Sequence, residues 1–152
     1  MLHFFESLES TGLGNVIRQS IWMFPVIQCF HLLGLALLGG TVLAVDMRML
    51  GLGLLEQTSG DLSRKLRPWM TGALALTILS GILMFLSEAV KCYYSPPFWY
   101  KMTCLALATI FAYTLRRKAA ESAPGPMTKL TALVSLALWF GVGFSGRWIA
   151  FY

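Results

Sequence analysis

The sequence predicts an all-α integral membrane protein built as a four-helix bundle. Hydrophobic residues make up 57% of the 152-residue chain and charged residues only 12%, whereas about a quarter of an ordinary soluble domain is charged. Four apolar stretches, at residues 21–45, 68–90, 98–115 and 130–151, approach the length of about 20 residues that crosses a bilayer core. Because they occupy most of the chain, we expect a single transmembrane domain over residues 1–152.

The segment before the first span is expected to lie at the membrane surface. Glu6 and Glu9 stand where a signal peptide would carry positive charge, so we expect no removable signal. Apolar residues alternate with polar ones in a way that favours a short helix along the outer interface, with a frayed terminus as the alternative. These apolar residues are Leu2, Phe4, Phe5 and Leu8.

The first span combines a proline with several small residues. Pro25 removes one helical hydrogen bond and favours a kink or a helix start there. Small residues further along allow a neighbouring helix or a flat ligand to approach the backbone closely, and they are Gly34, Gly39 and Gly40. Asp46 and Arg48 are interpreted as the cytoplasmic boundary of this span.

The second span is expected to begin at Pro68 and Trp69, after a loop over residues 56–67. Proline is favoured at the first position of a helix, and tryptophan is favoured at a membrane interface. Further along, polar and small residues recur at helical spacing and predict a face turned toward the bundle interior. This face consists of Thr77, Gly81, Met84 and Glu88.

The third and fourth spans follow an aromatic, proline-rich turn over residues 93–100, which is typical of an outer interface. Lys101 stands just inside the third span. The basic run over residues 116–118 is expected to form a cytoplasmic hairpin with the turn after it. The fourth span, residues 130–151, is rich in glycine toward its end and carries Arg147 there.

The distribution of positive charge predicts the orientation. Of the twelve lysines and arginines, eight lie in or beside the first and third loops. These are Arg48, Arg64, Lys65, Arg67, Arg116, Arg117, Lys118 and Lys129, whereas Arg18, Lys91, Lys101 and Arg147 lie toward the opposite side. An excess of Lys and Arg marks cytoplasmic loops, so both termini are expected outside. The net charge of +5 therefore reflects topology, and a nucleic acid partner is not expected.

His31 is the leading functional candidate because it is the only histidine within the four spans. An imidazole at that depth is costly unless it is coordinated or hydrogen-bonded. A haem iron needs an imidazole ligand and a small neighbour, and His31 with Gly34 supplies both. The alternatives are another metal, a helix-to-helix hydrogen bond to a backbone carbonyl or to Thr77 or Ser80, and a proton relay or quinone contact.

Other residues around a haem are more weakly indicated. Met84 is a candidate second axial ligand, since His and Met together ligate some haems, although a five-coordinate haem or one held between two subunits is equally open. Lys101 and Arg147 lie toward the outer side, where they could receive propionate groups or serve as interfacial anchors. The sequence shows no catalytic triad, phosphate loop or paired catalytic carboxylates, so it does not decide whether the protein is an enzyme.

Several segments of the chain resemble an uncharacterised bacterial family of four-span membrane proteins. These are Trp22 and Pro25, residues 31–34, 46–51, 80–85 and 97–101, and the terminal run 146–150. More distantly, His31 and Lys101 resemble a histidine and a lysine of copper-resistance D-type proteins, the four-helix bacterial protoporphyrinogen oxidase and the membrane part of a bacterial urate oxidase. That second resemblance implies b-type haem.

Three hypotheses for function follow. The first is a bacterial inner-membrane protein that binds haem b through His31 and serves electron transfer, or acts as the membrane partner of a periplasmic redox enzyme. The second is a copper or small-solute transport protein that uses His31, Met84 and Cys104 as soft ligands. The third is a cofactor-free scaffold in the lipid bilayer, in which faces of small residues bind further copies of the chain.

Overall fold

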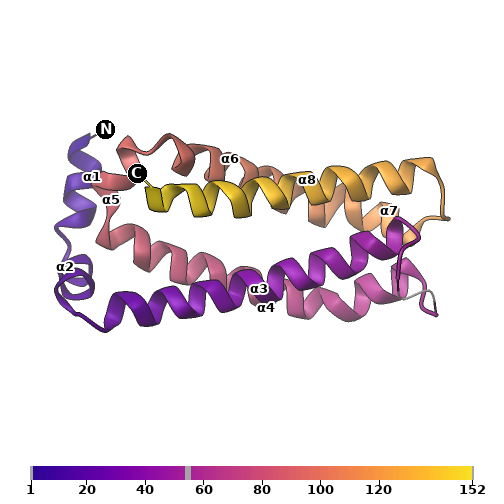
Figure 1. Cartoon of the computed structure of the whole chain (residues 1–152), viewed down its shortest axis with the longest axis horizontal. Coiled ribbons are helices and arrows are strands. Elements are labelled where there is room, and N and C mark those ends of the chain that lie inside the picture. The colour runs from indigo at the N-terminus through magenta and orange to yellow at the C-terminus, as the bar shows by residue number, and fades with distance from the viewer. Residues whose placement is uncertain (1, 54–55, 152) are drawn as a thin grey trace.

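The computed structural model, which describes residues 2–53 and 56–151, confirms the all-helical prediction, with no strand in those segments. Four long helical segments run side by side (Figure 1). They are α3 (Met23–Met49), α4 (Ser59–Ser87), α6 (Pro96–Phe111) extended by the π-helical turn η1 (Ala112–Arg116) and α7 (Arg117–Glu121), and α8 (Pro126–Trp148). Each is long and apolar enough to cross a membrane.

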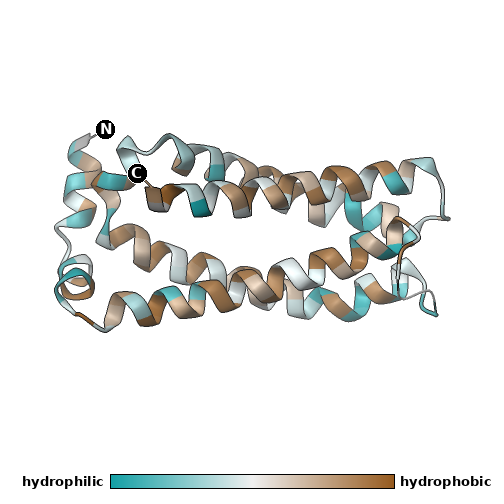
Figure 2. Ribbon diagram, in the orientation of Figure 1, coloured by the Kyte–Doolittle hydropathy of each residue, from teal (hydrophilic) through white to brown (hydrophobic). Residues whose placement is uncertain are grey.

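The four spans form two pairs. α3 packs along α4 and α6 packs along α8, and the two pairs meet where α3 contacts α8 and α4 contacts α7. Residues 50–53 and 56–58 and the loop over residues 122–125 lie together at one end of the bundle, which we call the loop end. Both termini lie at the other, the terminal end (Figure 1). Brown, hydrophobic segments dominate the middle of the long helices (Figure 2).

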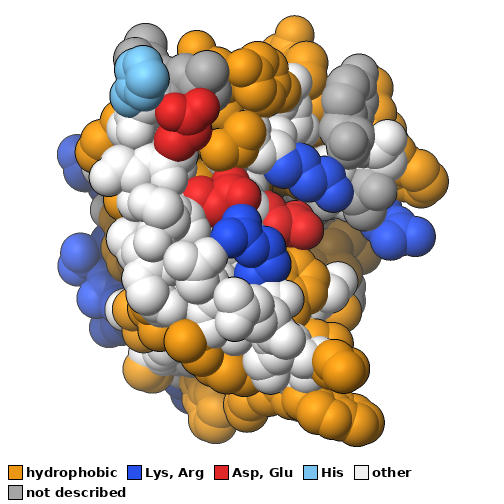
Figure 3. All heavy atoms as spheres, turned by 90° about the vertical axis from the view of Figure 1, so that its left-hand side faces the viewer, with side chains coloured by type: hydrophobic (Ala, Val, Ile, Leu, Met, Phe, Trp, Pro, Cys, Tyr) orange, Lys and Arg blue, Asp and Glu red, His pale blue; other side chains and the backbone are white. Residues whose placement is uncertain are grey.

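Short helices cover the terminal end, where a single surface helix was expected. They are α1 (Leu2–Glu9), α2 (Gly12–Gln19) and α5 (Ala89–Tyr94), and the chain finishes in a 3-10 turn, η2 (Ile149–Phe151). The Glu9 carboxylate connects them, since it accepts a hydrogen bond from the Val90 N–H at 2.8 Å and pairs with Arg18 at 2.5 Å. Figure 3 shows acidic and basic side chains together on this end of the molecule.

The helix that carries the second span begins nine residues before the predicted start, at Ser59, so Pro68 lies inside the helix and not at its first position. The Thr58 hydroxyl caps the helix by accepting a hydrogen bond from the Asp61 N–H at 3.1 Å. Leu62 then packs with Val45 and Ala120 in the core at the loop end. The polar residues over 59–67 therefore belong to a helix that is buried on one side.

The predicted turn between the third and fourth spans is present at residues 122–125, but the prediction was wrong to include residues 116–118 in this hairpin. These residues remain helical, and the third span continues to Glu121 through the π-helical turn. Asp46 was expected to mark a membrane boundary, and its ion-pair partner was not predicted from the sequence. In the structure its carboxylate is fully buried and pairs with Arg116 at 2.6 Å. Arg116 Nη2 also donates to the Val42 carbonyl at 3.1 Å. The ion pair thus ties α3 to the end of the third span.

Among the described residues, two apolar clusters lie along the bundle axis. The first is centred on Leu38, Val42, Met70, Leu74 and Ala112, with Trp139 packed against it. The second, at the loop end, contains Val45, Met49, Leu62, Ala120 and Ala132. The Asp46–Arg116 pair lies beside both clusters, since Val42 and Val45 are on adjacent turns of the same helix. The half of the bundle toward the terminal end contains a cavity instead of a third cluster.

Candidate functional site

A cavity of about 250 Å³ lies between the two helix pairs, and His31, Thr77 and Lys101 are the polar side chains that line it. The rest of its lining is apolar apart from Gly81. Its apolar side chains come from all four spans: Leu35 and Leu38 of α3, Ile78, Ile82 and Phe85 of α4, Phe98, Met102 and Leu105 of α6, and Val142 of α8. A site of this kind offers a small number of polar groups within an apolar enclosure.

Hydrogen bonding orients the His31 imidazole. Its Nδ1 lies 2.9 Å from the Ser80 Oγ, and the side chain is almost fully buried, with 7% of the residue exposed. The Ser80 hydroxyl has one hydrogen, and its shorter contact is the 2.6 Å bond that it donates to the Leu76 carbonyl. We therefore assign Nδ1 as the donor to Ser80, which leaves Nε2 with an unshared electron pair. Within the described segments, the hydrogen bond with defined geometry at this ring involves Nδ1 and not Nε2, and the Thr77 backbone also lies close enough to interact with the ring.

This arrangement confirms one of the expectations for His31, the hydrogen bond to the second span. It also matches the way proteins prepare a metal-ligating histidine. In such sites one ring nitrogen donates to a fixed acceptor, which sets the tautomer and the ring orientation, while the other nitrogen ligates. The hydrogen bond to Ser80 and a role for Nε2 as a ligand are therefore compatible.

Glycines create the space around His31. A Cβ at Gly81 would lie 3.3 Å from His31 Cε1, so a larger residue there would press on the ring. Gly34 has a different role, because a Cβ there would lie 2.6 Å from Thr77 Oγ1, and it does not line the cavity. Gly34 therefore allows α3 and α4 to approach each other, which the sequence predicted as one use of its small residues.

Lys101 projects from the second turn of α6 and brings the positive charge of an ammonium group to the cavity. It packs beside Gly146 of α8, where a Cβ would lie in ordinary contact, 3.6 Å from the lysine Nζ. Among the described residues, no carboxylate lies within ion-pair distance of this ammonium. An ammonium without a partner at this depth is costly, and it favours an anionic or hydrogen-bond-accepting ligand.

The other predicted ligands are not at the cavity. Met84 and Arg147 are absent from its lining, and the Arg147 guanidinium lies over the Phe151 ring at 5.5 Å. Cys104 faces α8, where a Cβ at Gly141 would lie 3.2 Å from its sulfur. The described residues contain no group of three or more His, Cys, Asp or Glu side chains that could hold a metal ion. Any metal here would depend on His31 and on ligands from a prosthetic group.

One side of the cavity lies at the outer surface of the bundle, between α4 and α6. Ile78 and Ile82 of α4 and Met102 of α6 line it, yet they are between 41% and 50% exposed. These residues lie along the line where α4 and α6 face each other, which we call the α4–α6 seam. Phe85 and Phe98 stack across this seam, with ring centroids 5.5 Å apart and an interplanar angle of 10°. An apolar molecule in the bilayer can therefore approach the site sideways, between α4 and α6.

Sequence reasoning found His31, Ser80 and Lys101 but missed the contact between Gly81 and His31. A signal for it was present, because Gly81 follows Ser80 directly and so lies at the same depth in the second span. It also missed Phe85 and Phe98, which were read only as part of apolar and interfacial segments.

Comparison with known proteins places the chain in a family but gives it no activity. The family of unknown function DUF6644 matches residues 4–152. The chain belongs to this family. No curated protein and no solved structure matches it. The closer resemblance seen in the sequence, to an uncharacterised family, agrees with this membership, whereas these comparisons show no similarity to copper-resistance D-type proteins.

Proposed function

We propose that this member of DUF6644 binds a b-type haem in the cavity, with His31 Nε2 as an axial ligand. In this proposal it serves electron transfer or acts as the membrane partner of a redox enzyme. The observation that carries the proposal is a buried imidazole whose Nδ1 donates to Ser80 and whose Nε2 is left with an unshared electron pair beside an apolar cavity. Haem supplies a one-electron couple whose potential its surroundings adjust.

The other residues at the site fit this group. The Lys101 ammonium is suited to pair with a propionate carboxylate. Apolar side chains from four helices are suited to contact the porphyrin faces and to exclude water. The exposed seam between α4 and α6 provides a route for an apolar macrocycle to enter from the bilayer.

The small volume of the cavity means that haem binding requires the bundle to open. The cavity volume of about 250 Å³ is below the range of about 300–1000 Å³ that accommodates drug-sized ligands. Binding therefore requires the two helix pairs to separate along the seam. The two pairs meet through the contacts of α3 with α8 and of α4 with α7, so a small opening between α4 and α6 leaves these contacts in place.

The distribution of charged residues along the chain supports a location for the protein in the cell and an orientation in the membrane. The excess of lysine and arginine near the loop end favours a cytoplasmic position for that end. In the inner membrane of a bacterium, both termini would then face the periplasm. The haem would lie in the outer half of the bundle, where a periplasmic redox partner or a second copy of the chain can approach it.

The copper hypothesis is less well supported by the arrangement of the soft ligands. Met84 and Cys104 do not line the cavity with His31, and copper sites need such ligands to converge. We keep copper handling and a cofactor-free scaffold as the alternatives that the experiment must separate.

The proposal is tested by purifying the protein in a mild detergent from haem-replete cells. A dithionite-reduced minus oxidised absorption spectrum and a metal analysis are recorded. We expect b-type haem bands in the wild type and their loss in His31→Ala. His3→Ala is the matched control because His3 is exposed on α1, and it should retain the bands. Lys101→Gln should lower haem occupancy without abolishing the Soret band.

A colourless, iron-free wild type overturns the proposal, and copper in that preparation would favour metal handling. A haem spectrum that survives His31→Ala overturns the assignment of His31 as the ligand. A colourless protein without copper whose His31→Ala variant keeps its oligomeric state would favour the scaffold.

A further inference from the structure

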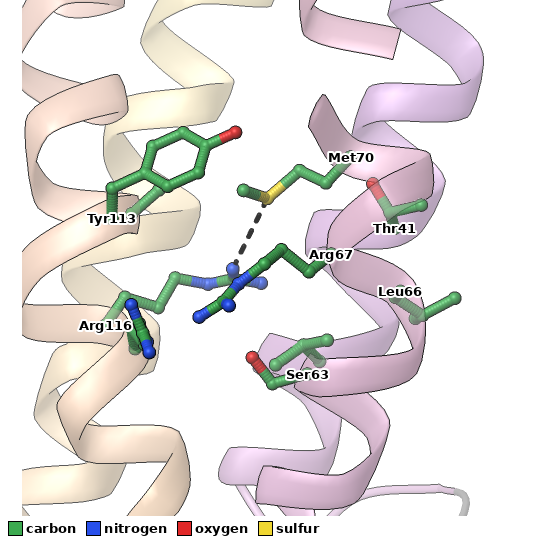
Figure 4. A pocket seen from close by; sticks show the side chains of 10 residues that line it. Thr41, Ser63, Leu66, Arg67, Met70, Tyr113 and Arg116 are labelled. Atoms are coloured by element: carbon green, nitrogen blue, oxygen red, sulfur yellow. Dashed lines mark hydrogen bonds between the residues drawn. The ribbon is translucent and has the colours of Figure 1, made fainter. Parts of the chain in front are cut away.

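A second pocket lies toward the loop end, on the seam between α4 and the end of the third span (Figure 4). Three arginines line it: Arg67 of α4, Arg116 of η1 and Arg117 of α7. In Figure 4 the Arg67 and Arg116 side chains extend toward one another from opposite sides of the pocket. This pocket is separate from the His31 cavity, and the first apolar cluster lies between them.

The pocket carries more positive than negative charge. Asp46 neutralises Arg116 at 2.6 Å. Arg117 has only a long contact of 3.7 Å with Glu121, and both side chains are about half exposed, so the contact is weak. Arg67 has no acidic partner among the residues that the structure describes. Guanidinium groups held near each other repel unless an anion lies between them.

Hydrogen-bond donors accompany the charge. Ser63 precedes Arg67 by one turn of α4, and its hydroxyl makes no hydrogen bond within the described segments, so it remains available to a ligand. The Thr41 and Tyr113 hydroxyls also line the pocket but already contact the Leu38 carbonyl and Thr71. A ligand with several acceptor oxygens therefore meets Ser63 and two guanidinium groups.

The depth of the pocket indicates where such a ligand would come from. From Arg67 to Ser87, α4 rises 20 residues, or about 30 Å, which is the thickness of a bilayer hydrocarbon core. Trp69 lies two residues inside Arg67 and is 60% exposed, as expected at a membrane interface. Arg67 would therefore lie at the edge of the hydrocarbon core, from which its long side chain can reach lipid phosphate groups.

We infer that this pocket binds the phosphoryl group of an anionic phospholipid, held by Arg67 and Arg117 with the Ser63 hydroxyl. The enclosed volume of about 20 Å³ holds about one water-sized group. One phosphoryl oxygen would enter it while the rest of the headgroup stays at the membrane surface. Inorganic phosphate shares this chemistry, and the experiment distinguishes the two sources.

Binding is measured by native mass spectrometry of the full chain released from neutral detergent, titrated with phosphatidylglycerol, phosphatidylcholine or inorganic phosphate. We expect phosphatidylglycerol to bind most tightly, and Arg67→Gln to weaken its binding about tenfold, the usual loss for one charge-assisted contact. Arg64→Gln is the matched control because Arg64 lies on the same helix, pairs with Asp61 and is exposed. It should change the affinity less than about twofold, since exposed pairs contribute little.

Two results overturn the inference: equal affinity of the wild type for phosphatidylglycerol and phosphatidylcholine, and equal losses in Arg67→Gln and Arg64→Gln. Tight binding of inorganic phosphate that Arg67→Gln removes, without preference for phosphatidylglycerol, overturns the lipid source and identifies a soluble anion. Arg67→Lys keeps the charge without the planar fork, and it should retain part of the affinity if Arg67→Gln fails to fold.

Discussion

Breaking the buried ion pair between α3 and the third span should be the most destabilising single change in the loop-end half of the bundle. The Asp46 residue is 0% exposed and the Arg116 side chain 4%. Arg116→Met removes the 2.6 Å contact to the carboxylate and the 3.1 Å hydrogen bond to the Val42 carbonyl. It leaves a buried charge without a partner, so we expect a loss of about 3–5 kcal/mol in the free energy of unfolding.

The double variant Asp46→Leu/Arg116→Met should recover most of this loss, because neither charge then remains to be buried. The assay is far-UV circular dichroism during titration of decyl maltoside micelles with sodium dodecyl sulfate. Arg117→Met is the control, since Arg117 is half exposed and its ion-pair distance is 3.7 Å; it should stay within about 0.5 kcal/mol of the wild type. Equal, small losses in Arg116→Met and Arg117→Met would refute this reasoning.

Two further predictions concern packing and thiol chemistry. Gly34→Ala should destabilise the protein by about 1–3 kcal/mol in the same titration, because its Cβ would meet Thr77 Oγ1 at 2.6 Å. Gly39→Ala is the control, since a Cβ there meets no atom within 4 Å, and it should be neutral or slightly stabilising. Equal effects of the two substitutions would contradict the packing argument. Burial raises the pKa of the Cys92 thiol from 9.0 to about 11, which lowers the fraction of reactive thiolate at pH 8 about a hundredfold. In a variant whose other cysteines are replaced by serine, alkylation of Cys92 at pH 8 should be slower by this factor in the folded protein than after unfolding in sodium dodecyl sulfate. Comparable rates in the two states would show that this thiol is not buried.

The sequence predicted the number of spans well because apolar length is a local property. It located their ends poorly, since residues 59–67 and 116–121 are polar enough to read as loops. Both segments are helical because Leu62 of the first packs with Ala120 of the second in the core at the loop end. A hydropathy profile does not contain this contact.

The candidate site was predicted in part for a similar reason. His31 and Ser80 are polar residues in apolar spans, so their pairing followed from depth. Met84 was placed on the same face as Thr77 and Gly81, but the lining of the cavity continues to Phe85 instead. A difference of one residue turns a helix by about 100°, and small errors in facing therefore decide which side chains meet a ligand.

The pairing of Asp46 with Arg116 also has a consequence for synthesis of the protein. The two residues are 70 positions apart, so α3 leaves the ribosome long before its partner exists. A carboxylate buried inside the protein without a counter-charge is costly. The first two spans therefore cannot reach their final packing until the third has arrived. Chains cut before residue 116 should remain loosely associated and open to membrane proteases, and those that include it should become resistant.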